Sequence, residues 1–201
     1  NLNLGVMVNT HSFYSYTDDV DRAARIGEII TKRYATNHVF TGYQFFPGGA
    51  DYTVPGMTVD TSKASLMDDD GRVFARLIDA AKEEHPMIMV NAVKVTSVDA
   101  THPVSVSKPI LTDWLRNELG FTGVVVTDDI EVGATVSGMS MAEYAVRTIN
   151  AGSDMVIIRN DAKHIKEVRD ALLQAVADGT ISEDRLDASV RRIMLMKFSN
   201  D

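Results

Sequence analysis

Cysteine does not occur among the 201 residues of this chain, and proline and tryptophan are scarce, with five and one residues. The lack of cysteine excludes disulfides and thiolate chemistry but leaves the cellular compartment open. No run of about 18 apolar residues occurs, so no segment is predicted to cross a membrane. Basic residues number 20 against 28 acidic ones, for a net charge of −8. This balance argues against nucleic-acid binding, which requires a basic surface.

The composition that remains is that of a globular protein. Hydrophobic residues make up 45% and charged residues 24% of the chain, which predicts one domain with a sizeable core. The chain starts at Asn1 in a strand-like run, without methionine and without a visible signal peptide. We therefore expect a fragment or a processed product.

Hydrophobic patterning alternates between strands and helices. Short apolar runs predict strands at 2–8, 39–46, 87–93, 123–127 and 155–158. Helical spacing and end signals predict helices at 18–34, 68–84, 107–119, 139–150, 162–177 and 182–198. This alternation is typical of βαβ units and a parallel sheet. Five strands are fewer than the eight that a closed barrel needs.

Two polar stretches carry weaker signals. Residues 47–67 contain three glycines and two prolines, which predicts a long irregular loop that is functional or mobile. The run Asp68-Asp69-Asp70 is interpreted as a solvated helix start, where acidic side chains suit the helix dipole. The five histidines show no metal-ligand spacing. We therefore predict no metal site and no cofactor.

Two adjacent carboxylates end the most apolar predicted strand. Asp128 and Asp129 follow the run Gly123–Thr127. In α/β barrels the chemistry sits at the carboxyl ends of the strands, which makes Asp128 a candidate nucleophile. The alternative is that Asp128 caps the helix or loop that follows. We interpret Asp129 as structural.

The segment Leu111–Asp129, LTDWLRNELGFTGVVVTDD, resembles the signature of glycoside hydrolase family 3, and within it the β-N-acetylhexosaminidases. Further likeness lies in Phe46–Gly48, Val98-Asp99, Ala151–Met155 and Arg185–Ile193. The resemblance implies that residues 1–201 form a single domain, the C-terminal part of an α/β, (β/α)8 TIM-like barrel. This barrel is incomplete in the chain, because its first strands are missing.

The resemblance also implies an activity, namely retaining hydrolysis of terminal N-acetylhexosamine from peptidoglycan or chitin-like fragments. Asp128 is then the nucleophile, and Asp60 is the surviving half of an Asp–His pair that serves as acid and base. The candidate substrate-binding residues are Gln44, Phe45, Asn91 and His102. The implied partner is therefore a carbohydrate, an amino-sugar glycoside.

The sequence departs from the family pattern at polar site positions. Ser62 stands where the acid/base histidine is expected, and Ala92 replaces a histidine at a strand end. The sugar-binding loop 44–50 lacks its lysine and both histidines. Because a serine hydroxyl cannot supply a proton near neutral pH, we expect weakened activity unless Asp60 or Asp51 acts as the acid.

These departures keep two alternatives open. The first is a catalytically degenerate homologue that binds sugar or a protein partner without hydrolysis. The second is a barrel enzyme whose catalytic groups lie elsewhere. In either case an open barrel exposes strand edges. We expect residues before Asn1, an exchanged element or a partner chain, as in a homo-oligomer, to cover those edges.

Overall fold

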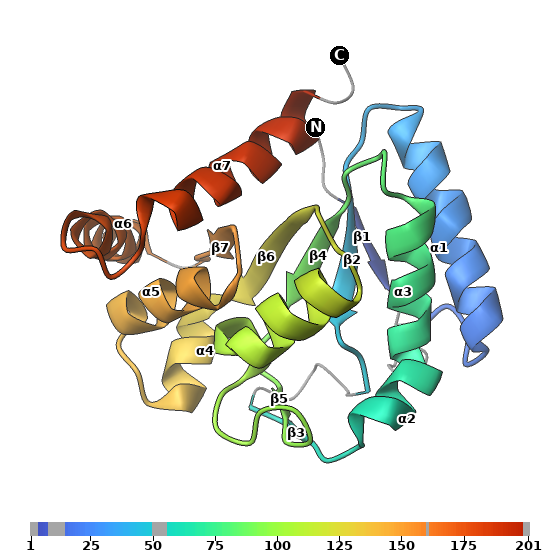
Figure 1. The fold of residues 1–201 in the computed structure, drawn as a ribbon, viewed down its shortest axis with the longest axis horizontal. Helices are drawn as coiled ribbons and strands as arrows, with labels where there is room; N and C mark the ends of the chain where they lie inside the picture. Colours follow the sequence, from blue (N-terminus) through green and yellow to red (C-terminus); the bar gives the residue numbers. More distant parts are fainter. Residues whose placement is uncertain (1–3, 8–14, 50–55, 160, 199–201) are drawn as a thin grey trace.

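The computed structural model describes residues 4–7, 15–49, 56–159 and 161–198 (Figure 1). Five parallel strands form one sheet in the order β1-β2-β4-β6-β7, and β3 and β5 pair separately. The strands are β1 (Leu4–Met7), β2 (Thr41–Phe46), β3 (Thr58–Val59), β4 (Met87–Val90), β5 (Lys94–Val95), β6 (Val124–Asp129) and β7 (Met155–Ile157). The α-helices are α1 (Val20–Ala35), α2 (Lys63–Asp68), α3 (Asp70–Ala80), α4 (Ile130–Ser137), α5 (Met141–Ala151), α6 (Ala162–Ala177) and α7 (Glu183–Phe198). A 3-10 turn, η1 (Val104–Val106), and a π-type helix, η2 (Pro109–Glu118), complete the set. The predicted α/β class with a parallel sheet is confirmed.

The alternation of side chains along β6 gives the sheet two different faces. Val125 joins the main core, which includes Trp114 of η2. Val124 and Val126 point the other way and pack with Met196 of α7. Successive strand residues point to opposite faces. The face of each residue at the carboxyl end of β6 therefore follows from its place in this alternation.

A buried ionic cluster around Asp154, just before β7, fastens α7 to the sheet. Its carboxylate accepts hydrogen bonds from Arg116 Nη2 (2.7 Å), Val125 N (2.9 Å), Ser189 Oγ (2.6 Å) and Arg192 Nη2 (2.9 Å). The family-like segments Ala151–Met155 and Arg185–Ile193 thus meet at the amino ends of β6 and β7. They lie at the opposite end of the strands from Asp128, and their contacts hold the fold together.

Three expectations from the sequence need correction. The stretch 47–67 is not structureless in its described part, since it holds β3 and the start of α2. The run 87–93 ends as a strand at Val90, and α4 was not predicted at all. Glycine and β-branched residues give α4 little intrinsic helix propensity. Asp129 supplies its N-cap instead, by accepting a hydrogen bond from Glu131 N at 3.0 Å.

The acidic run before α3 is also different from the prediction. Asp70 is fully buried, not solvated. Its Oδ2 accepts a hydrogen bond from Gly49 N at 2.7 Å. A Cβ at Gly48 would lie 2.2 Å from Asp70 Cβ, so glycine is required for this close approach. The carboxylate therefore anchors the end of the Pro47-Gly48-Gly49 turn.

The main sheet stays open, with β1 and β7 at its edges (Figure 1). The predicted fold, an incomplete barrel of the (β/α) type, is confirmed. What covers the two edges stays a prediction. No helix in the described part of the chain combines the length and the apolar character needed to cross a membrane.

Candidate active site

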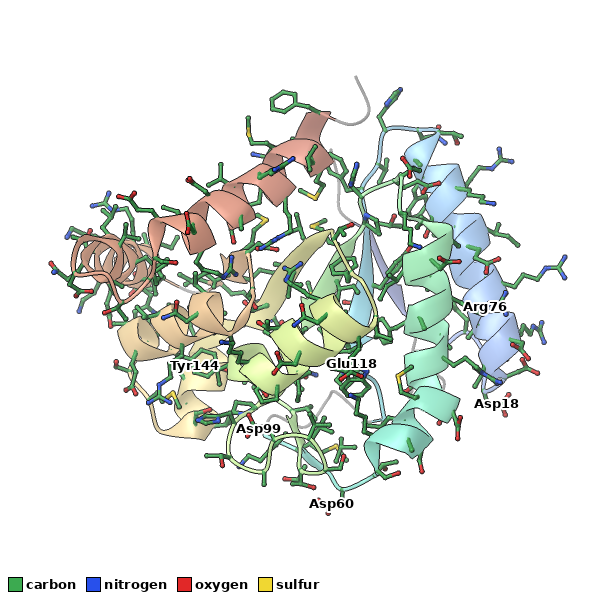
Figure 2. All side chains as sticks on the ribbon, in the orientation of Figure 1. Asp18, Asp60, Arg76, Asp99, Glu118 and Tyr144 are labelled. Atoms are coloured by element: carbon green, nitrogen blue, oxygen red, sulfur yellow. The ribbon has the colours of Figure 1, made fainter. Side chains whose placement is uncertain are left out.

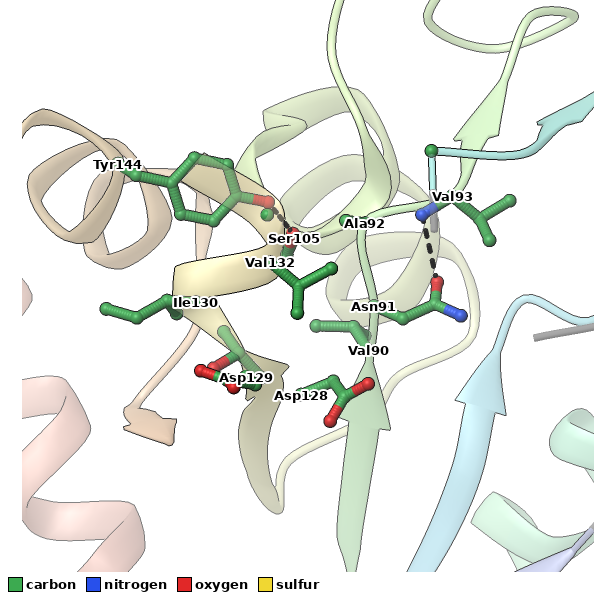
Figure 3. A pocket seen from close by; sticks show the side chains of 13 residues that line it. Val90, Asn91, Ala92, Val93, Ser105, Asp128, Asp129, Ile130, Val132 and Tyr144 are labelled. Carbon is green, nitrogen blue, oxygen red and sulfur yellow. Dashed lines mark hydrogen bonds between the residues drawn. The ribbon is translucent and has the colours of Figure 1, made fainter. Parts of the chain in front are cut away.

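The two carboxylates that end β6 have separate surroundings. Asp129 shares the face of Val125, is buried and caps α4. Asp128 falls on the other face, with Val124 and Val126, and its side chain is exposed. Figure 3 shows the two carboxylates pointing in opposite directions from the end of the strand. The structural interpretation of Asp129 is confirmed, and Asp128 is left available for a ligand.

Asp128 opens into a small pocket of about 50 Å³ between the ends of β4 and β6. The residues that line it are Gly56, Val90, Asn91, Ala92, Val93, Ser105, Thr127, Asp128, Asp129, Ile130, Val132, Gly133 and Tyr144. On one wall the Tyr144 hydroxyl is hydrogen-bonded to Ser105 Oγ at 2.5 Å (Figure 3). Burial raises the pKa of Tyr144 to about 12, so its hydroxyl stays protonated near neutral pH. Among its described lining residues, the pocket therefore offers the exposed carboxylate of Asp128 beside the neutral hydroxyl groups of Tyr144 and Ser105.

Asn91 and Gln44 share the face of Asp128. Asn91, which follows β4 and is buried, lies in the pocket lining, and its Oδ1 accepts a hydrogen bond from Val93 N at 3.2 Å. Its amide Nδ2 is then the group that can donate to a sugar hydroxyl. Gln44 is the register partner of Met89, which in turn pairs with Val126. Gln44 thus lies one layer below Asp128 on the same face of the sheet.

Two other predicted residues lie outside this pocket. His102 donates through its backbone N–H to Asp99 Oδ1 at 2.9 Å, and its ring Nδ1 lies 3.3 Å from Asp99 Oδ2. Asp60 lies at the lower rim of Figure 2, where its Oδ1 accepts a hydrogen bond from Thr96 Oγ1 at 2.7 Å. Ser62 caps α2 by accepting from Ser65 N. The structure does not bring these groups to Asp128.

The loop around Asp99 is a structural unit. Burial alone would raise the pKa of Asp99, but hydrogen bonds from the backbone of His102, from the Ser107 hydroxyl and from the backbone of Thr101 hold it below its ordinary value. The carboxylate is therefore charged near neutral pH and occupied by its neighbours. This explains why His102 points to Asp99 and not into the pocket.

Phe45 adds no catalytic group to the pocket. Phe45 is half-buried in β2, at the point where the register to β4 shifts, and is not among the lining residues. Asp51 lies outside the described residues. Within the described residues, histidine, aspartate and glutamate side chains form no cluster of three or more that could hold a metal ion.

Sequence reasoning missed part of the pocket. Ser105, Tyr144 and Gly133 line it together, and a Cβ at Gly133 would lie 2.3 Å from Tyr144 Oη. Ser105 follows the family-like pair Val98-Asp99 by six positions, and this closeness was the signal in the sequence that could have pointed to it. Tyr144 comes from α5, and no local pattern links this helix to the end of β6.

Comparison with known proteins identifies the family of this chain. The family model described as "Glycosyl hydrolase family 3 N terminal domain" matches residues 8–196. A β-hexosaminidase A of Pseudoalteromonas piscicida is 26% identical over 91% of this chain and 34% of its own length. A probable β-glucosidase C of Aspergillus flavus is 36% identical over 47% of the chain and 16% of its own length.

A solved structure supports the same assignment. The family 3 β-N-acetylglucosaminidase from Paenibacillus sp. str. FPU-7 superposes with a TM-score of 0.85 and 28% identity. The superposition covers 98% of this chain and 39% of the other. The chain thus spans roughly a third of the length of the β-hexosaminidase and somewhat more of the solved enzyme. The solved neighbours carry a TIM-barrel-like domain. With the family profile spanning nearly all of its residues, the chain belongs to glycosyl hydrolase family 3.

Proposed function

We propose that this chain is the catalytic part of a β-N-acetylhexosaminidase that hydrolyses with retention and uses Asp128 as its nucleophile. One observation carries the proposal. Asp128 is the exposed carboxylate at the carboxyl end of β6, whereas its neighbour Asp129 is committed to capping α4. The β-hexosaminidase and the β-N-acetylglucosaminidase among the similar proteins support an N-acetylhexosamine substrate. Peptidoglycan or chitin-like fragments are the proposed natural sources.

We also propose that residues 1–201 form one domain, the C-terminal part of a family 3 barrel. The open edges at β1 and β7 support this. An edge strand presents unpaired N–H and C=O groups that favour pairing with another strand. Further polypeptide or a second copy of the chain would cover these edges.

The proposed reaction takes two steps. A carboxylate oxygen of Asp128 attacks the anomeric carbon, and the bond from that carbon to the leaving oxygen breaks. The leaving oxygen takes a proton from an acid, and the sugar stays esterified to Asp128. Water then attacks the same carbon, gives its proton to a base and releases the Asp128 carboxylate.

The proton transfers are the weak part of this site. Asp60 is proposed as the surviving acid/base carboxylate, yet it bonds to Thr96 and is not a lining residue of the pocket. Among the described lining residues, the ionisable side chains are Asp128, Asp129 and Tyr144. Since Tyr144 stays protonated and Asp129 is a cap, no group there is suited to exchange protons near neutral pH. We therefore propose slow turnover, because such transfers typically contribute ~10²–10⁴-fold.

The test uses 4-nitrophenyl β-N-acetylglucosaminide, whose nitrophenolate departs without a proton. We expect hydrolysis by the wild-type chain and none above background by Asp128→Asn. Because no described lining residue is suited to act as the base of the second step, added azide should accelerate turnover and give a β-glycosyl azide, since azide attacks without losing a proton. Equal hydrolysis by the wild type and Asp128→Asn would overturn the assignment. The matching glucoside, run beside it, tests the β-glucosidase likeness.

A second candidate function is binding of sugar or a protein partner without hydrolysis. The observation that favours it is the lack of a suitable proton donor among the described lining residues. Calorimetry with N-acetylglucosamine and muropeptide fragments separates the two functions. Saturable binding without release of nitrophenol from the activated glycoside supports the degenerate homologue, and turnover that depends on Asp128 excludes it.

A further inference from the structure

A second hollow of about 170 Å³ adjoins the pocket of Asp128. It is lined by Gly56, Ala92, Lys94, Thr101, Pro103, Val136, Ser137 and Met139. Two of these residues, Gly56 and Ala92, also line the first pocket. The two spaces therefore share a wall at the end of β4.

The shared wall is low because both of its residues are small. Ala92 contributes only a methyl group. Gly56 has a φ of +74°, and a Cβ there would approach Val136 Cβ to 3.3 Å. A larger side chain at Gly56 would be strained and would crowd the second hollow. A ligand bound at Asp128 can therefore extend past these two positions.

Lys94 is held at the rim of the second hollow by the strand that carries it. Val93 and Val95 on either side are buried, at 4% and 0% exposure, whereas Lys94 is half-buried. The Lys94 backbone N–H donates to Met57 O at 2.9 Å, which fixes the strand. Because neighbouring strand residues alternate in direction, the lysine side chain is turned away from the core.

Among the described residues that line this hollow, Lys94 is also the one that carries a charge. None of the ion pairs found in the described part of the chain includes it. Asp99 follows Lys94 by five positions, and Asp60 directly follows β3, the strand paired with β5. Both carboxylates are already engaged, Asp99 by His102 and Ser107 and Asp60 by Thr96. Among the residues that the structure describes, the hollow thus holds a cation without an anionic partner, in a space that adjoins the pocket of Asp128.

We propose that this second hollow receives the leaving group of the glycoside, and that Lys94 selects a leaving group that carries a carboxylate. Pro103 and Met139 offer apolar surface to its body, and Thr101 and Ser137 offer hydroxyls to its polar groups. An anionic leaving group beside Asp128 is repelled unless a cation offsets the repulsion, and Lys94 supplies that cation. This inference rests on the function proposed above.

The test compares two nearly isosteric ligands, the 4-carboxyphenyl and 4-nitrophenyl 1-thio-β-N-acetylglucosaminides, by calorimetry. Thioglycosides resist hydrolysis, so the chain is used with Asp128 in place. We expect the carboxyphenyl ligand to bind about threefold to fivefold tighter, the range of a partly exposed ion pair. The preference should vanish in Lys94→Met. It should persist in Lys197→Met, which removes the same charge from the exposed end of α7.

The affinity for the nitrophenyl ligand serves as the folding control for each variant. A preference that survives in Lys94→Met, or its absence from the wild-type chain, overturns this inference. In both cases the proposed function still stands if the wild type releases nitrophenol from the oxygen-linked glycoside. If neither thioglycoside binds and no nitrophenol is released, the inference and the proposed function fail together.

Discussion

Replacing Asp154 by asparagine removes the single negative charge from the centre of the cluster that holds α7. The side chain of Asp154 is fully buried, and Arg116 and Arg192 approach it to 2.7 and 2.9 Å. Arg185 Nη1 lies 3.6 Å from the same carboxylate. Asparagine keeps the shape of the side chain but leaves three guanidinium groups without their counter-charge.

The size of the effect follows from burial. Removing one partner of a buried ion pair costs about 3–5 kcal/mol, because the remaining charge stays desolvated. A typical domain is stable by only about 5–15 kcal/mol. With a urea dependence of about 2 kcal/mol per molar, a loss of about 4 kcal/mol lowers the unfolding midpoint by about 2 M.

The assay is urea unfolding followed by circular dichroism. The matched control is Asp170→Asn, since Asp170 pairs with Lys166 and Arg169 on the exposed side of α6 and should change little. A midpoint shift for Asp154→Asn no larger than that of the control would refute the reasoning. It would mean that the cluster contributes no net stability.

The same cluster predicts a pH dependence. Burial alone would raise the pKa of Asp154, but Arg116, Arg192, Ser189 and the Val125 N–H outweigh it and lower the pKa. A carboxylate with a lowered folded pKa stabilises the fold above its unfolded value, about 3.9, and loses that contribution as the pH falls through the folded pKa. Stability measured between neutral pH and strong acid should therefore fall less steeply below about pH 4 in Asp154→Asn than in the wild type.

Three further substitutions, measured by the same unfolding assay, test the contacts that position the residues around the candidate site. Asp129→Ala removes the N-cap of α4 and should cost about 1 kcal/mol, with Asp129→Ser restoring most of it. Gly133→Ala places a Cβ 2.3 Å from Tyr144 Oη and should destabilise the chain by more than a helical Gly→Ala change at an open position. Tyr144→Phe leaves Ser105 Oγ without its partner and should cost about 1–3 kcal/mol. Unchanged midpoints would contradict the packing described for each residue.

The parts of this fold that follow from local rules were predictable from the sequence. The alternation of apolar runs and helical stretches predicted the parallel sheet. The side chains of Asp128 and Asp129 lie on opposite faces of the sheet, because side chains alternate in direction along a strand such as β6. Capping preferences likewise account for Asp129, whose oxygen serves a backbone N–H of the next helix.

The parts that depend on distant contacts were not predictable. The pairing of β3 with β5 orients Lys94, yet each strand has only two residues and no visible pattern. Tyr144 reaches Ser105 across 39 positions of the chain. Asp70 was expected in solvent because acidic residues suit helix starts, but the Gly49 N–H requires a buried acceptor there. The family motifs near Asp154 proved to stabilise the fold and lie away from the site.

The central claim is that Asp128 attacks the anomeric carbon, and the most direct measurement is peptide mass spectrometry on the chain quenched shortly after mixing with 4-nitrophenyl β-N-acetylglucosaminide. Because a slow second step lets the ester accumulate, we predict a burst of nitrophenolate equal to the chain concentration. The peptide that contains Asp128 should carry one N-acetylhexosaminyl group, and Asp128→Asn should show neither signal. A burst with the sugar attached to another residue, or turnover without any adduct, would contradict the account.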